Sequence, residues 1–350
     1  LKILIILFIC FLFFKINLKI YFFSFLYLLS FLFLLKYVDT NLFFGFDIFT
    51  GGNDGLVYMS YGNTLFNYLI NFNFYEFFRG VENVFYFPSS LRFFWPINKI
   101  FFGDSFYGYI LIGYLTIIIL YYIFLNLFGF KLAIFISLLI FFTRIFEGYA
   151  LSIYKFLQHI QAGDAEPLAI FSFLMSILLF LIIIKSEKIN TKNLSLYSFG
   201  FGFFLFISIS LRPNFSPTAL LFLLLYLSYN FIYFQNIKHS FYSILGFSFY
   251  FLIPFHNYFY GDSFILFSSG SQYNTQVPII IYKQAFIDIL NFKLNTSESI
   301  YQINSQIIKW IKPDHFHYII SFLILFYSLF SNNNFNIKTI CLLAISQHIV

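Results

Sequence analysis

Charged side chains are scarce in this 350-residue chain. Asp, Glu, Lys and Arg together make up 10% of the residues, whereas about 25% is usual in a soluble domain. Apolar residues account for 60% of the sequence, with 60 Phe and 28 Tyr, and the mean hydropathy is +0.83. Most of such a chain must be surrounded by lipid or by its own apolar helices. The composition excludes an ordinary water-soluble enzyme and predicts a polytopic membrane protein.

Cysteine and the familiar metal and nucleotide motifs are also lacking. Cys10 and Cys341 lie in apolar runs, where a cysteine is a small packed hydrophobe rather than half of a disulfide or metal pair. No zinc spacing, Walker loop, G-x-S-x-G or dinucleotide fingerprint occurs in the sequence. Gly200-Phe201-Gly202 lies inside an apolar run and predicts close helix packing. In a membrane protein the net charge of +6 is interpreted through the distribution of lysine and arginine between the two sides of the bilayer. We therefore expect no nucleic-acid partner.

The apolar segments predict an all-α membrane protein, a multi-spanning helical bundle. A spanning helix needs about 20 largely apolar residues, and cutting the chain at its charged and Asn-, Gly- and Pro-rich stretches leaves eight or nine spans. We expect one membrane-embedded domain over residues 1–350, trimmed at both ends. The first span is 18–35, and the others, which contain no charged residue, run near 106–128, 132–142, 167–184, 195–211, 217–234, 241–255, 316–330 and 339–350.

The connections between these spans divide by charge. When the sides alternate, one set holds nine lysines and a single acid, Glu187, while the other set holds all four arginines and every other acid. By the positive-inside rule the lysine-rich set is cytoplasmic, together with the N-terminus. The two long loops, 36–105 and 256–315, then face outside and carry short interfacial helices. We expect any chemistry on the outer face.

The first outer loop carries an acid on a glycine-flanked turn, Asp54, and an earlier acid, Asp47. Apolar residues follow Asp54 at mostly helical spacing, which predicts a helix along the membrane surface with Asp54 near its N-terminus. Asp54 is either a helix cap or a catalytic acid–base group. Further on, the aromatic stretch 86–96 is typical of an interfacial belt.

The second outer loop brings a histidine and two acids to a membrane boundary. His159, Asp164 and Glu166 precede the span that begins at Pro167. Asp164 or Glu166 could cap that helix, because Pro suits its first turn. Alternatively the acids bind a ligand, or Arg144 or Lys155 in the same loop pairs with them.

Two shorter outer segments complete the candidate residues. Arg212, between adjacent spans and next to Pro213, is either a snorkelling anchor or an anion clamp, because a guanidinium grips phosphate bidentately. His256 and Asn257 follow the span 241–255 and are either an interface cap or part of a binding site.

This layout resembles the GT-C class of membrane glycosyltransferases, such as protein mannosyltransferases and lipid A aminoarabinose transferases. One helix, a long outer loop with an early Asp, a second acid-bearing outer loop, many spans and a late long outer loop cover the whole chain. Many mannosyltransferases have an adjacent Asp-Glu in the first loop, whereas this chain has Asp54-Gly55. The local matches are Gly52-Asn53-Asp54-Gly55 with Tyr58 and Tyr61, Ala162-Gly163-Asp164-Ala165-Glu166-Pro167, Leu211-Arg212-Pro213-Asn214, and His256-Asn257-Tyr258 with Gly261.

The resemblance implies inverting transfer of a sugar from a polyprenyl-phosphate donor to a glycan, lipid or protein acceptor on the outer face. Asp54 would be the base, with Asp47 as the second candidate. Arg212 and Arg144 would stabilise the leaving lipid phosphate. The remaining candidates, Glu166, Asp164, His159, His256 and Asn257, would bind substrate. No cofactor is required, although a divalent metal at the carboxylates is compatible with the chemistry.

Three alternatives to the glycosyltransferase remain open on the sequence. A transporter or flippase of lipid-linked saccharides usually keeps ionisable groups at the bilayer midplane and shows repeated halves, and neither feature is visible here. An outer-face polysaccharide ligase or polymerase would also use lipid-linked sugars. A purely structural membrane protein is the third alternative.

Overall fold

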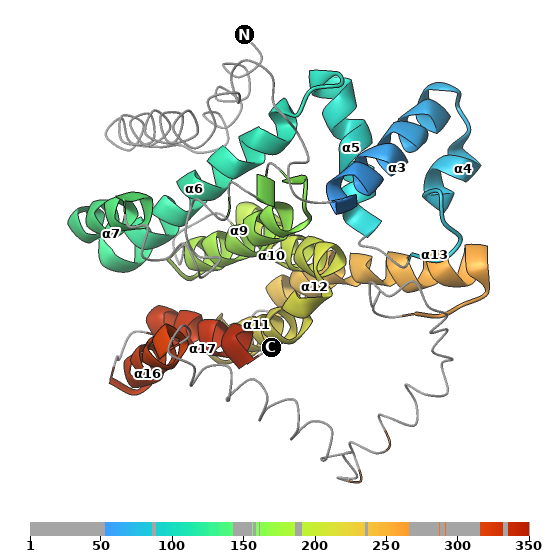
Figure 1. The fold of residues 1–350 in the computed structure, drawn as a ribbon. Helices are drawn as coiled ribbons and strands as arrows, with labels where there is room; N and C mark the ends of the chain where they lie inside the picture. The colour runs from blue at the N-terminus through green and yellow to red at the C-terminus, as the bar shows by residue number, and fades with distance from the viewer. Residues whose placement is uncertain are drawn as a thin grey trace.

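The computed structural model describes residues 53–85, 89–142, 156, 159–160, 162–185, 191–234, 237–265, 287, 291, 316–331 and 335–349. All regular elements in this part of the chain are helical, without a strand, as the sequence predicts (Figure 1). In chain order they are α3 (Asn53–Ile70), α4 (Phe74–Arg79), α5 (Ser89–Phe102), α6 (Tyr107–Phe128), α7 (Phe130–Phe142), α9 (Glu166–Lys185), α10 (Thr191–Leu211), the 3-10 turn η3 (Pro213–Phe215), α11 (Ser216–Tyr229), the π-turn η4 (Asn230–Phe234), α12 (Ile237–Phe247), the 3-10 turn η5 (Ser248–Phe251), α13 (Leu252–Gly261), α16 (Phe316–Ser331) and α17 (Phe335–Ile349).

Four of these helical segments are long and apolar enough to cross a membrane. They support the expectation of a membrane protein and coincide with four expected spans. Helix α7 has 13 residues, about 20 Å at 1.5 Å per residue, against a hydrocarbon core of about 30 Å. The first expected span, 18–35, lies outside the described residues. The four segments are Tyr107–Phe128, Glu166–Lys185, Leu194–Leu211 and Pro213–Ile232.

The centre of the bundle is a cluster of aromatic rings from α9, α10 and α11. Phe180, Phe201 and Phe222 are fully buried, and their rings approach one another at centroid distances of 5.0 to 6.5 Å. Tyr226 is also buried in this cluster, and its hydroxyl lies 2.7 Å from the Ser198 Oγ. The ring contacts and the satisfied hydroxyls fix these three helices against one another.

Helices α10 and α12 cross with their backbones in contact. A Cβ atom at Gly202 would lie 1.9 Å from the Ser243 carbonyl oxygen, and one at Gly246 would lie 2.2 Å from that of Phe199. Only glycine allows both approaches. The prediction of close helix packing at 200–202 is therefore confirmed at Gly202.

Helices α6 and α9 run in the same direction. Near their beginnings, the Tyr109 hydroxyl of α6 donates to the Asp164 carbonyl oxygen, which lies two residues before α9. At their ends, the Lys185 Nζ lies 2.7 Å from the Asn126 carbonyl oxygen. Helix α10 then returns antiparallel to α9, so Glu166 and Arg212 meet at one end of the bundle. We call it the Glu166–Arg212 end.

The helices of the first expected outer loop, 36–105, pack against this same end. Ser90 of α5 and Ser210 of α10 are joined by a hydrogen bond of 2.5 Å. Tyr58 of α3 and Trp95 of α5 are buried in one core with the beginnings of α6 and α9. Figure 1 shows α3, α4 and α5 gathered to one side of the bundle, toward which α13 projects.

Two expected outer segments contain packed helix. Within the stretch 86–96, expected to be an interfacial belt, Leu91, Arg92 and Trp95 are buried against neighbouring helices. The first residues of the expected late outer loop, 256–315, are helical, because α13 continues to Gly261. Phe, Tyr and Trp suit an interface and a packed helix equally well.

Candidate functional site

The Glu166–Arg212 end gathers most of the predicted site residues that the structure describes. Glu166 is the first residue of α9, and Pro167 follows it in the first helical turn, where the missing N–H is not needed. Arg212 follows the end of α10 in an extended conformation (φ −143°, ψ 102°). Pro213 favours this conformation, because the residue before a proline avoids helical geometry.

Glu166 and Arg212 form an ion pair. Their side chains are 29% and 36% exposed, so the pair is accessible from solvent. The Glu166 Oε2 and the Arg212 Nε are nevertheless buried and have no hydrogen-bond partner among the residues that the structure describes. The pair therefore keeps one unused acceptor and one unused donor. Arg144 and Lys155, the expected partners of these acids, lie outside the described residues.

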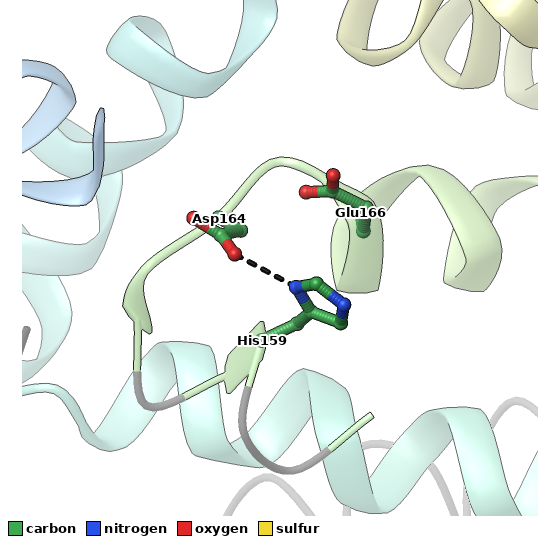
Figure 2. A group of neighbouring side chains, drawn as sticks. All are labelled: His159, Asp164 and Glu166. Atoms are coloured by element: carbon green, nitrogen blue, oxygen red, sulfur yellow. Dashed lines mark hydrogen bonds and ion pairs between the residues drawn. The ribbon is translucent and has the colours of Figure 1, made fainter. Parts of the chain in front are cut away.

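His159 and Asp164 form a second pair beside the first. The His159 Nδ1 lies 2.7 Å from the Asp164 Oδ2 (Figure 2). Gly163 has a φ of +72°, which favours glycine and turns the chain so that the two side chains meet. The hydrogen bond of the Asp164 carboxylate goes to His159 rather than to the free amides of α9, so capping does not explain Asp164.

The three side chains could hold a metal ion by position alone. Potential ligand atoms of His159, Asp164 and Glu166 all lie within 4.8 Å of one another, and Figure 2 shows them around one space. In this arrangement, however, Glu166 is paired with Arg212 and the His159 Nδ1 with Asp164. A cation would have to displace Arg212 or take the remaining carboxylate and imidazole atoms.

Asp54 lies in the first turn of α3, which begins at Asn53. The prediction of a helix at this place is confirmed. One turn later, Tyr58 is buried in the core that also contains Tyr109 and Leu211. The N-terminal part of α3 therefore adjoins the Glu166–Arg212 end. Asp47 lies outside the described residues.

His256 and Asn257 hold α13 to the first loop. The His256 ring stacks on Phe85 at a centroid distance of 3.6 Å, and its Nε2 lies 2.9 Å from the Arg79 carbonyl oxygen. The Asn257 Oδ1 accepts a hydrogen bond of 2.8 Å from the Phe85 N–H. Burial lowers the pKa of His256, which favours the neutral ring in this contact. Both residues therefore pack α13 against the first loop.

Arg92 is one of two structurally important residues that the sequence did not indicate. Its side chain is fully buried, and it donates to the Gly80 carbonyl oxygen and to Glu82, each at 2.7 Å. The guanidinium also lies 4.7 Å from the centroids of the Tyr61 and Phe85 rings. Burial and the Glu82 carboxylate raise the pKa of Tyr61, so its hydroxyl stays protonated and donates to Glu82. This cluster ties α3, α5 and the 80–85 segment together.

Tyr109 was also not predicted, because a tyrosine at the start of an apolar span gives no sequence signal. Its ring is fully buried and stacks on Trp95 at 5.6 Å. Its hydroxyl holds the backbone of Asp164. Tyr109 thus fixes the loop that carries His159 and Asp164 against α6.

Comparison with protein-family models, with characterised proteins and with solved structures finds no match to this chain.

Proposed function

We propose that the chain transfers a sugar from a polyprenyl-phosphate donor to a hydroxyl acceptor, with the Glu166–Arg212 end as the active site. One observation carries the proposal: an accessible Arg212–Glu166 ion pair with unused polar atoms lies beside the His159–Asp164 pair at one end of a membrane-type bundle. The GT-C-like sequence layout supports the same class of reaction.

Arg212 has the chemistry needed at the leaving group. As the bond between the anomeric carbon and the phosphate oxygen breaks, negative charge grows on the lipid phosphate. The Arg212 side chain is 36% exposed, so its guanidinium can donate to that phosphate while its Nη2 stays with Glu166. Glu166 holds the fork in position. Arg144 is a second candidate cation from the sequence.

The proposed reaction needs no metal. With His159 neutral, Asp164, Glu166 and Arg212 sum to a charge of −1 at neutral pH, so a divalent cation arriving with the anionic donor is compatible with the site. Addition of a chelator to the transfer assay distinguishes the two cases. Unchanged transfer supports the metal-free site, and loss restored by one added divalent ion supports the other.

The proposed topology places this end outside the cell. Eight or nine spans with a cytoplasmic N-terminus put Glu166 and Arg212 outside and Lys185 inside. The parallel course of α6 and α9 and the contact of Lys185 with Asn126 at the opposite end are consistent with this order. Membrane lipid surrounds the bundle, and the acceptor, a glycan, lipid or protein, approaches from outside.

The test is transfer of radiolabelled sugar from a panel of polyprenyl-phosphate donors in membranes containing the chain, with Arg212→Lys as the variant. Lysine keeps the charge but not the fork, so we expect about 10²-fold lower kcat at normal expression. Arg79→Lys, in a part-buried pair with Glu76, is the matched control and should transfer normally.

A fully active Arg212→Lys variant would reduce Arg212 to a membrane anchor. If the intact chain transfers no sugar but moves lipid-linked saccharide across vesicle membranes, the flippase alternative replaces the transferase. If it joins lipid-linked glycans to one another, the ligase or polymerase alternative applies.

A further inference from the structure

The His159–Asp164 pair has the geometry of a proton-accepting dyad. The distance of 2.7 Å between Nδ1 and Oδ2 is that of a strong, charge-assisted hydrogen bond. The backbone reinforces it, because the Asp164 N–H donates to the His159 carbonyl oxygen at 3.1 Å. The Tyr109 hydroxyl holds the Asp164 carbonyl oxygen from the other side. Asp164 is therefore fixed in front of the ring.

This bond determines which ring nitrogen is free. An ionised carboxylate only accepts hydrogen bonds, so in the neutral imidazole Nδ1 carries the proton and Nε2 has the lone pair. No hydrogen bond to the His159 Nε2 occurs among the described residues. The side chain is 29% exposed, so a hydroxyl from solvent can reach it. The same carboxylate then stabilises the imidazolium that forms when Nε2 takes a proton.

We propose that His159, positioned by Asp164, is the base that accepts the acceptor's hydroxyl proton, in place of Asp54. This assignment rests on the glycosyl transfer proposed above. The acceptor oxygen forms a new bond to the anomeric carbon, and the bond from that carbon to the phosphate oxygen breaks. The proton passes from the hydroxyl to the His159 Nε2, and the electron pair leaves with the polyprenyl phosphate beside Arg212. The proton returns to water after product release.

One geometric feature favours His159 over Asp54 for this role. A carboxylate oxygen of Glu166, the partner of Arg212, lies within 4.8 Å of a His159 ring nitrogen, so base and phosphate cation belong to one group of side chains.

The experiment compares four variants in the radiolabelled transfer assay, with donor binding and thermal unfolding measured on each purified protein. His159→Ala should lower kcat by about 10²–10⁴-fold with donor binding unchanged, and added imidazole should restore part of the rate. His159→Asn keeps an N–H for Asp164 and should melt normally, yet be inactive without rescue. Asp164→Asn should also lower kcat, because the asparagine no longer holds His159 in the tautomer with its proton on Nδ1. Asp54→Asn tests the competing assignment at the first turn of α3 and should lower kcat far less than His159→Asn.

Several outcomes would overturn the assignment. If His159→Asn transfers at the wild-type rate, His159 is not the base. If Asp54→Asn alone abolishes transfer while melting normally, the role returns to Asp54. If a chelator abolishes wild-type transfer and imidazole rescues nothing, His159 is a metal ligand instead. These results all require an active wild-type chain, whereas a wild-type chain that transfers from no donor would refute the proposed function itself.

Discussion

At the scale of single residues, Arg92 is the charged side chain that is fully buried among the described residues. A buried guanidinium is tolerated only when its donors are satisfied and its charge is paired. Gly80 and Glu82 accept hydrogen bonds from its two Nη atoms, while the Nε has no partner among the described residues, and the rings of Tyr61 and Phe85 cover the guanidinium faces. Removal of Arg92 would leave Glu82 without its counter-charge. The stability of the first-loop helices therefore depends on this one side chain.

We predict that Arg92→Met destabilises the protein by about 3–5 kcal/mol, the usual cost of breaking a buried pair from one side. The matched variant is Arg79→Met, which removes a part-buried i,i+3 pair with Glu76 and should cost about 1 kcal/mol. Thermal or denaturant unfolding of the purified protein in detergent measures both. Equal and small effects of the two variants would show that the Arg92 cluster contributes little.

Sequence reasoning could identify candidate residues but not their partners. Glu166, Asp164, His159 and Arg212 stood out because they lie at the edges of apolar runs. The pairing of Glu166 with Arg212 arises from the antiparallel return of α10 along α9, which no local pattern encodes. The buried ion pair of Arg92 could not be recognised, because its partner Glu82 lies outside the aromatic stretch 86–96.

At the scale of elements, the crossing of α10 and α12 is the closest described helix contact. In lipid, where apolar side chains gain nothing by leaving water, close backbone packing between small residues drives helix association. Gly202 and Gly246 provide such a contact from both sides. A Cβ atom at Gly200, two residues before Gly202, would meet the Leu179 side chain at 3.2 Å.

We predict opposite effects of the same substitution at two glycines of α10. Gly202→Ala places a Cβ 1.9 Å from the Ser243 carbonyl oxygen and should destabilise the protein by about 1–3 kcal/mol, because the helices must separate. Gly200→Ala should be neutral or slightly stabilising, since alanine favours the helix and the Leu179 side chain can move. The melting temperatures of the two variants test this difference. Equal shifts would contradict the close contact of α10 and α12 at Gly202.

The helices themselves were largely predictable. The expected span 167–184 matches α9 to within one residue at each end, because its apolar run is bounded by Glu166 and Lys185. Beyond the expected span 241–255, α13 continues through Tyr258, Phe259 and Tyr260 to Gly261, and no formal charge marks where it ends. Where a boundary is marked by charge the sequence shows it, and where aromatics continue it does not.

At the scale of the whole molecule, the two ends of the bundle differ in chemistry. One end carries the ion pair, the His159–Asp164 pair and the first-loop helices, and the other carries Lys185 against Asn126. Because lysines mark the cytoplasmic side, this asymmetry gives the topology a direct test.

We predict that Ser60 and Lys238 lie on opposite sides of the membrane. Both positions are exposed, so Ser60→Cys and Lys238→Cys, in a background with Cys10 and Cys341 replaced by Ser, should be accessible to reagents. An impermeant thiol reagent added to intact cells should label only the cysteine at position 60. Labelling of both positions from outside, or of position 238 alone, would refute the proposed orientation.

The contact between the first loop and α13 also has a consequence in time. His256 reaches the carbonyl oxygen of a residue 177 positions earlier in the chain. At a synthesis rate of about 5–20 residues per second, roughly 10–35 s pass between the appearance of Arg79 and that of its partner. The first-loop helices are therefore synthesised long before α13 exists. During that interval the face of Phe85 on which His256 later stacks has no partner from α13.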